Sequence, residues 1–140
     1  MSPLETYHQQ HHEMIGRVTE ILEHLDADTV RADSTHVHRL IGQFAEILQR
    51  HLAQEDRLLY PKLMQHRDEK VRATAQRYHD EMGGLSQKLG DYLVRWSTPT
   101  EIGKRPADFA AETRTLLDQL AKRILREDTE LYPLAARSGL

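Results

Sequence analysis

Apolar residues recur at three- and four-residue spacing in four stretches of the chain, and no stretch shows sustained alternation of apolar and polar residues. The first spacing is typical of amphipathic helices and the second of half-buried strands, so the pattern predicts helices and no sheet. The four predicted helices run over about residues 3–25, from 33 or 34 to the Tyr60-Pro61 step, 68–96 and 108–136.

Proline and small polar residues mark the ends of these helices. Pro3 suits the first turn of the first helix, and Asp33 or Ser34 is expected to cap the second. Pro61 is expected to kink or end that second helix. Residues 26–29 and 97–106 are predicted links. Four amphipathic helices joined by short links predict an all-α, up-down-up-down four-helix bundle, with residues 1–140 forming a single domain.

An eleven-residue pattern occurs twice, near the ends of the second and fourth helices. The first copy, residues 51–61, reads H-L-A-Q-E-D-R-L-L-Y-P, and the second copy, residues 123–133, reads R-I-L-R-E-D-T-E-L-Y-P. Both carry Glu-Asp, a leucine and Tyr-Pro at matching offsets, which makes the two halves of the chain similar helical hairpins. We expect the Tyr-Pro tyrosines to have a structural role. His51 stands four residues before Glu55, and Arg123 takes the matching place before Glu127.

Several histidines and glutamates fall on or beside the apolar stripes. His51 and Glu55 lie in the middle of the second stripe, and burying them costs several kcal/mol unless a partner satisfies them. On the first helix His11 is central, while His8 and His12 lie to its sides. The candidate metal ligands drawn from all four helices are His8, His11, His51, Glu55, His79 and Glu127. Imidazole with carboxylate suits iron, zinc or manganese; buried pairs with no metal are the alternative.

Composition narrows the classes of function. The chain has no cysteine, which excludes thiolate ligands and disulfides, and its nine histidines all lie within residues 8–79. A formal charge of −3 without a basic stripe gives no reason to expect nucleic acid or an anionic membrane as a partner. With no apolar run of membrane-spanning length and no signal-peptide pattern, we expect a cytoplasmic protein.

Across almost its whole length the chain resembles the hemerythrin-like, HHE cation-binding family. The resemblance rests on the segments Tyr7–Ile15, His51–Pro61, Tyr78–Met82 and Glu127–Pro133. It implies a four-helix bundle with a di-iron site, one histidine ligand from each helix, and bridging glutamates from the second and fourth helices. On this chain these roles go to His51, Glu55, His79 and Glu127. The first-helix ligand is His11, with His8 and His12 as rivals.

The chain departs from the family pattern at Arg123, where the fourth-helix histidine is expected. A guanidinium cannot ligate a metal, but an inward Arg123 could pair with Glu55 or Glu127 and replace a second cation. We therefore expect a mononuclear or depleted iron site in a carrier or sensor of metal, dioxygen or a related oxidant. The alternative is a metal-free interaction module in which Arg123 neutralises both glutamates. No motif indicates a substrate, so an iron-dependent redox enzyme is the third hypothesis; the oligomeric state stays open.

Overall fold

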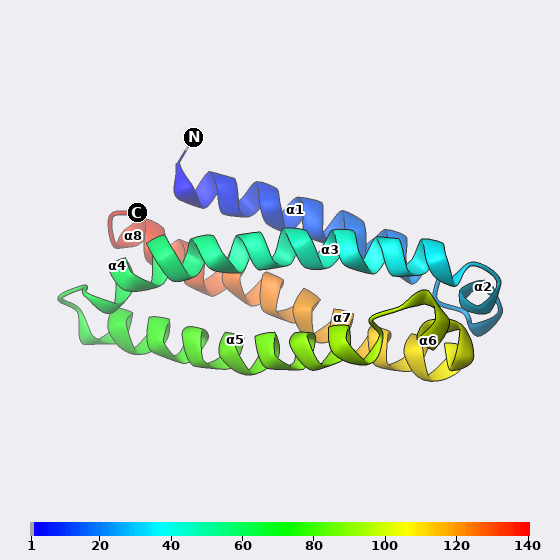
Figure 1. Ribbon diagram of the computed structural model, residues 1–140. Helices are drawn as coiled ribbons and strands as arrows, with labels where there is room; N and C mark the ends of the chain where they lie inside the picture. The colour runs from blue at the N-terminus through cyan, green and yellow to red at the C-terminus, as the bar shows by residue number, and fades with distance from the viewer. Residues whose placement is uncertain (1) are drawn as a thin grey trace.

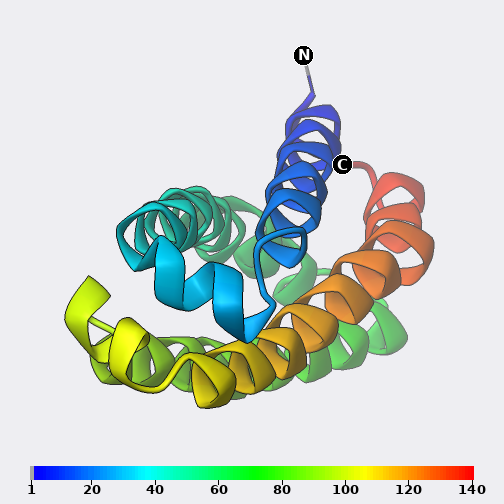
Figure 2. The same ribbon diagram turned by 90° about the vertical axis from the view of Figure 1, so that its right-hand side faces the viewer.

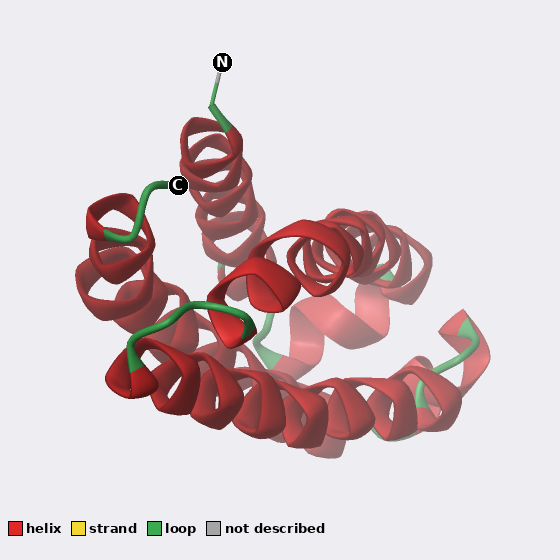
Figure 3. Ribbon diagram, turned by 90° about the vertical axis from the view of Figure 1, so that its left-hand side faces the viewer, coloured by secondary structure: helices red, strands yellow, loops and turns green. Residues whose placement is uncertain are grey.

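Four long helices run alternately up and down and confirm the predicted all-α bundle. The computed structural model describes residues 2–140, and within that range every regular element is helical (Figures 1 and 3). The long helices are α1 (Pro3–Leu22), α3 (Ser34–Gln54), α5 (Glu69–Arg95) and α7 (Pro106–Arg126). Helix α1 packs against α3 and α7, and α7 also contacts α5. Both termini lie at one end of the bundle (Figure 1).

The predicted links contain two short helices that cover the opposite end of the bundle (Figure 2). They are α2 (Ala27–Ala32) and α6 (Pro99–Lys104), which begin where Asp26 and Thr98 accept a backbone N–H bond. Helix α2 packs on α7 and α6 packs on α3, and each buries one apolar side chain, Val30 and Ile102. The first long helix accordingly ends at Leu22, three residues earlier than predicted.

The two copies of the repeat adopt the same irregular helix. Residues Glu55–Leu59 and Glu127–Leu131 form π-helices, η1 and η2, which continue into the short helices α4 (Tyr60–Met64) and α8 (Tyr132–Arg137). The N–H groups of Tyr60 and Tyr132 donate to the carbonyls of Glu55 and Glu127, five residues earlier. Proline has no N–H and crowds the preceding turn, so a wider turn accommodates it without ending the helix. The second helix therefore continues through Pro61 to Met64.

One level of buried polar side chains interrupts the apolar interior of the bundle. It lies on the helices that carry the repeat and the residues that contact it. One apolar cluster lies on the α2 and α6 side of this level and includes Met14, Leu48 and Ile124. A second lies at the end with the termini. The buried charged or titratable residues between them, here called the polar layer, are His11, His51, Glu55, Arg123 and Glu127. In the described part of the chain, no helix has the length and apolar character needed to cross a membrane.

Candidate metal centre

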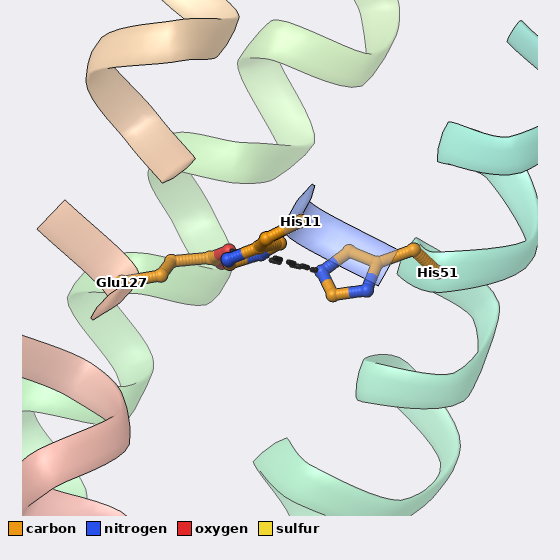
Figure 4. Close-up of side chains that lie close together, drawn as sticks. All are labelled: His11, His51 and Glu127. Atoms are coloured by element: carbon orange, nitrogen blue, oxygen red, sulfur yellow. Dashed lines mark hydrogen bonds and ion pairs between the residues drawn. The ribbon is translucent and has the colours of Figure 1, made fainter. Parts of the chain in front are cut away.

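Three side chains of the polar layer point at one another from three different elements (Figure 4). They are His11 of α1, His51 of α3 and Glu127 of η2, and one ligand atom from each lies within 4.8 Å of the others. His11 Nε2 is 2.9 Å from Glu127 Oε1 and 3.1 Å from His51 Nε2. All three side chains are buried, so this cluster is a compact set of imidazole and carboxylate donors without competing solvent.

Hydrogen bonds on the outer side of each imidazole fix which nitrogen faces the cluster. His11 Nδ1 is 2.8 Å from Asp128 Oδ1, and His51 Nδ1 is 2.7 Å from Gln10 Oε1. Both partner oxygens accept, so each Nδ1 carries the hydrogen and each neutral ring presents the lone pair of Nε2 to the cluster. Two such lone pairs 3.1 Å apart repel unless a positive charge lies beside them. The outer hydrogen bonds therefore prepare both rings to bind a cation.

Glu55 adds a second carboxylate to the cluster. Its Oε1 lies 3.2 Å from His51 Nε2, and its Oε2 accepts a 2.6 Å hydrogen bond from the hydroxyl of Tyr132. Two buried carboxylate oxygens, Glu55 Oε1 and Glu127 Oε2, have no hydrogen-bond partner. An unsatisfied buried acceptor costs about 1–3 kcal/mol, and more when it is charged. The residues present thus fit a metal ion, which would satisfy Glu55 Oε1 and both Nε2 atoms together, while Glu127 Oε2 faces the guanidinium of Arg123 at 3.6 Å.

The ionisation of the cluster reflects the same crowding of charges. Burial alone would lower the pKa of His51, but hydrogen bonds to Glu127 and Glu55 outweigh it and raise the pKa to about 9. Burial and the charge of Glu127 raise the pKa of Glu55. For Glu127, burial is outweighed by hydrogen bonds to His11 and His51, which lower its pKa. Without a metal ion, the positive charge of this cluster is therefore a proton on His51.

Arg123 turns into the bundle, although the sequence pattern puts it at the edge of its stripe. Only 6% of the residue is exposed, and its Nε lies 3.6 Å from Glu127 Oε2. The other end of the guanidinium is held from α5: Nη1 donates to Glu81 Oε2 at 3.1 Å, and Nη2 donates to the Tyr78 carbonyl. Its carbon lies 4.3 Å from the centre of the Tyr78 ring. A fixed positive charge thus stands beside one carboxylate of the centre, and it makes no ion pair with Glu55.

The family of the chain indicates what kind of site this cluster is. The sequence pattern of the hemerythrin HHE cation binding domain matches residues 2–135, nearly the entire chain. The chain belongs to this family. Comparisons with curated proteins and with solved structures give no match. Membership of the HHE family, together with the His11, His51 and Glu127 cluster, indicates a metal-binding protein.

Two other predicted ligands lie outside the cluster of this HHE domain. The side chain of His8 is 51% exposed, and its Nδ1 lies 3.1 Å from Asp128 Oδ1, the atom that also holds His11. The side chain of His79 is 46% exposed; its ring packs edge-on against Tyr60, and its Nε2 is 3.8 Å from Asp56 Oδ1. The structure therefore brings together His11, His51, Glu55 and Glu127 from the predicted set, and leaves His8 and His79 at the surface.

The sequence interpretation missed that a tyrosine enters the centre. Both Tyr-Pro tyrosines were expected to have a purely structural role, yet the hydroxyl of Tyr132 lies 3.1 Å from His11 Nε2. The repeat contains a signal for this, because each tyrosine reaches toward the first residue of the other copy. Tyr132 contacts His51 at 3.3 Å, and Tyr60 accepts a 3.4 Å hydrogen bond from Arg123. The two copies are thus interlocked across the bundle of this HHE domain.

Proposed function

We propose that this HHE domain binds a single iron ion and acts as a carrier or sensor of the metal, or of dioxygen or a related small oxidant. Four residues would hold the ion: the Nε2 atoms of His11 and His51 and the carboxylates of Glu55 and Glu127. This donor set suits iron and also accepts zinc or manganese. The identity of the ion is therefore a matter for direct metal analysis.

One observation carries the proposal. Two imidazole Nε2 atoms whose Nδ1 atoms are already committed to acceptors face each other at 3.1 Å, beside carboxylate oxygens without partners. A structural role alone would favour donors opposite acceptors, as buried polar networks require. When both imidazoles are neutral, all of these atoms are acceptors gathered around one point, and a metal ion can take the place of the proton that His51 otherwise holds.

Arg123 is the reason for proposing one ion rather than two. It takes the fourth-helix position where the family pattern has a histidine, and its charge lies 3.6 Å from the unpartnered oxygen of Glu127. Glu81 and Tyr78 hold the guanidinium in that place. We propose that this fixed cation does the electrostatic work of a second metal, since it stabilises the carboxylate without ligating anything.

A surface cleft offers the ion a path to the buried ligands. The cleft, about 200 Å³ in volume, is lined by His8, His11, His12, Ile15, Ile124 and Asp128. Buried His11 and its partner Asp128 both line this cleft, so the cleft reaches one of the proposed ligands. We propose that His8 and Asp128 lie on the entry path, with Asp128 also orienting His11.

The inward position of Arg123 also favours a second candidate, a metal-free interaction or regulatory module. In that case Arg123 would neutralise the glutamates and no ion would bind. The contacts support this only in part, because Arg123 approaches Glu127 and makes no ion pair with Glu55, whose Oε1 has no hydrogen-bond partner. Neutralisation is incomplete, and for this reason we favour the metal-binding function.

Metal analysis of tag-free protein tests the proposal. After anaerobic incubation with ferrous iron, and separately with zinc or manganese, we expect one tightly held ion per chain. His11→Ala and His51→Ala should each abolish tight binding. His12→Ala is the matched control, since His12 neighbours His11 on α1 but is exposed, and it should keep the ion. No retained metal, or equal loss in the control, would refute the proposal and leave the metal-free module.

A further inference from the structure

The hydroxyl oxygen of Tyr132 lies among all four proposed ligands. It is 2.6 Å from Glu55 Oε2, 3.1 Å from His11 Nε2, 3.3 Å from His51 Nε2 and 3.4 Å from Glu127 Oε1. A phenol has one hydrogen and two lone pairs, so it cannot form good hydrogen bonds with four partners. Any ion bound by these four side chains would therefore stand next to this oxygen.

Packing prevents the Tyr132 ring from moving away to make room. The residue is buried, and its ring stacks on His11 at 5.1 Å between centroids. Tyr7 lies against it at 5.7 Å, and His8 covers it edge-on at 5.2 Å. Since the backbone here is the turn between η2 and α8, fixed by the Tyr132 N–H bond to Glu127, the oxygen stays at the centre.

We propose that Tyr132 is a fifth ligand of the centre, bound as a phenolate, and that it makes the site selective for ferric iron. The proposal rests on the metal-binding function above and extends it. Two neutral imidazoles, two carboxylates and one phenolate carry three negative charges. Glu81 pairs with the nearby Arg123 and offsets its charge, so a trivalent ion balances the ligands of this buried site. Tyrosine oxygen is an established type of iron ligand in proteins, and hard oxygen donors favour a small, highly charged ion.

Coordination requires the phenol to lose its proton, and the contacts provide the acceptor. When an ion is bound, the phenol would give up its proton to Glu55 Oε2, which accepts the hydrogen bond of Tyr132 at 2.6 Å. Exchange with solvent then removes it. Glu55 Oε1 remains available as a ligand atom because it has no other partner. The bound cation favours the phenolate in the same way that bound zinc favours thiolate and hydroxide.

The matching tyrosine of the first copy lacks these contacts. The hydroxyl of Tyr60 accepts from Arg123 at 3.4 Å, so a guanidinium stands where Tyr132 has two imidazoles. Both tyrosines are buried and both precede a proline after a π-helix. Tyr60→Phe therefore makes the same chemical change as Tyr132→Phe without removing a hydrogen bond to any proposed ligand, and serves as its control.

The test uses the full-length, tag-free chain loaded with ferric nitrilotriacetate. We expect a phenolate-to-iron charge-transfer band in the visible spectrum, which Tyr132→Phe abolishes and Tyr60→Phe retains. Tyr132→Phe should also lower ferric affinity by at least about tenfold, the usual scale for losing a group that holds a metal in place, and change zinc affinity much less. Resonance Raman spectra of the wild-type chain, with ring-deuterated tyrosine, should show shifted tyrosinate bands whatever the stability of the variants.

Metal content and the spectrum together separate the two hypotheses. Iron retained by the wild-type chain without a tyrosinate signal would overturn the role of Tyr132 while leaving the metal-binding function intact. A band that survives in Tyr132→Phe would do the same. Loss of the band in Tyr60→Phe alone would identify Tyr60, in the first copy of the repeat, as the ligand instead of Tyr132. A wild-type chain that retains no metal would overturn both proposals.

Discussion

Replacing Arg123 by methionine tests whether this side chain acts as a built-in cation. Methionine keeps much of the length of the side chain and removes its charge. At 3.6 Å, a full unit charge would attract the Glu127 carboxylate by about 5 kcal/mol at an effective dielectric of ~20. The guanidinium charge is delocalised and shared with Glu81, so we expect a loss near the lower end of the range for breaking a buried pair, about 3 kcal/mol.

The cost should depend on whether a metal ion occupies the centre. In protein stripped of metal with a chelator, Arg123→Met leaves Glu127 without its cation, and the melting temperature should fall by about 10 °C for a chain of this length. In the zinc-loaded protein the ion itself stabilises Glu127, so the loss should be smaller. By linkage, the variant should then bind zinc more tightly, by about tenfold for each 1.4 kcal/mol of difference.

Urea unfolding of both forms, together with chelator competition for zinc, measures these quantities. Arg126→Met is the matched control: the side chain of Arg126 lies one turn along the chain, donates to the same Glu81 oxygen at 2.9 Å, and is 45% exposed. It makes no ion pair with Glu127, so its loss should cost less than about 1 kcal/mol and leave zinc affinity unchanged. An equal cost of Arg123→Met in both forms, or weaker zinc binding, would refute the idea that Arg123 stands in for a cation.

Further predictions concern the ionisation of His51, a glycine within α5 and a buried hydrogen bond of Tyr92. Because His51 is protonated below a pKa of about 9, a metal must displace that proton; affinity measured by competition should rise with pH by up to about tenfold per unit below that pKa, and a flat profile would contradict it. The raised pKa of His51 also stabilises the fold of the metal-free protein. This stabilisation is fully present below the unfolded pKa of about 6.5 and should be lost as pH rises through the folded pKa of about 9. Gly84→Ala should stabilise the chain by about 0.5–1 kcal/mol in urea unfolding, since the added Cβ meets nothing within 4 Å inside α5; destabilisation would show that the glycine has another role. Tyr92→Phe removes a 2.6 Å buried hydrogen bond to Thr113 and should lower the free energy of unfolding by about 1–2 kcal/mol. The double variant Tyr92→Phe/Thr113→Val leaves no unpaired hydroxyl and should lose less stability than Tyr92→Phe alone.

The long helices were predictable because each is encoded by its own residues. The three- and four-residue spacing of apolar side chains places a stripe on each helix, and Asp33, one of two residues proposed as a cap, accepts from the His36 N–H as expected. The pattern did not reveal helices α2 and α6. These helices are too short to give a periodic signal and are stable only through their packing on α7 and α3. The π-helices were also missed, since a proline predicts a disturbance without specifying how the backbone absorbs it.

The residues of the candidate site likewise divide into those that the sequence indicates and those that only the packing of the helices brings in. The pair His51 and Glu55 could be recognised from sequence because residues four apart on a helix share a face whatever surrounds them. His11 was favoured because it is central on the first apolar stripe, but His8 and His12 stayed as rivals, because the choice depends on how α1 is rotated against α3 and η2. Asp128 belongs to the Glu-Asp step of the repeat, but nothing in the sequence indicates that Asp128 and Gln10 orient the imidazoles, since their partners come from other helices.

By itself, then, the sequence determined the four helices, their family, and the two glutamates that the repeat places on facing stripes. Tertiary structure alone decided that Arg123 turns inward and that the hydroxyl of Tyr132 lies among the ligands. Both outcomes depend on distances of a few ångströms between side chains more than forty residues apart, such as Arg123 with the Tyr78 ring and Tyr132 with His51. Periodicity fixes the face on which a residue lies, but only the packing of the helices against one another sets what that residue meets.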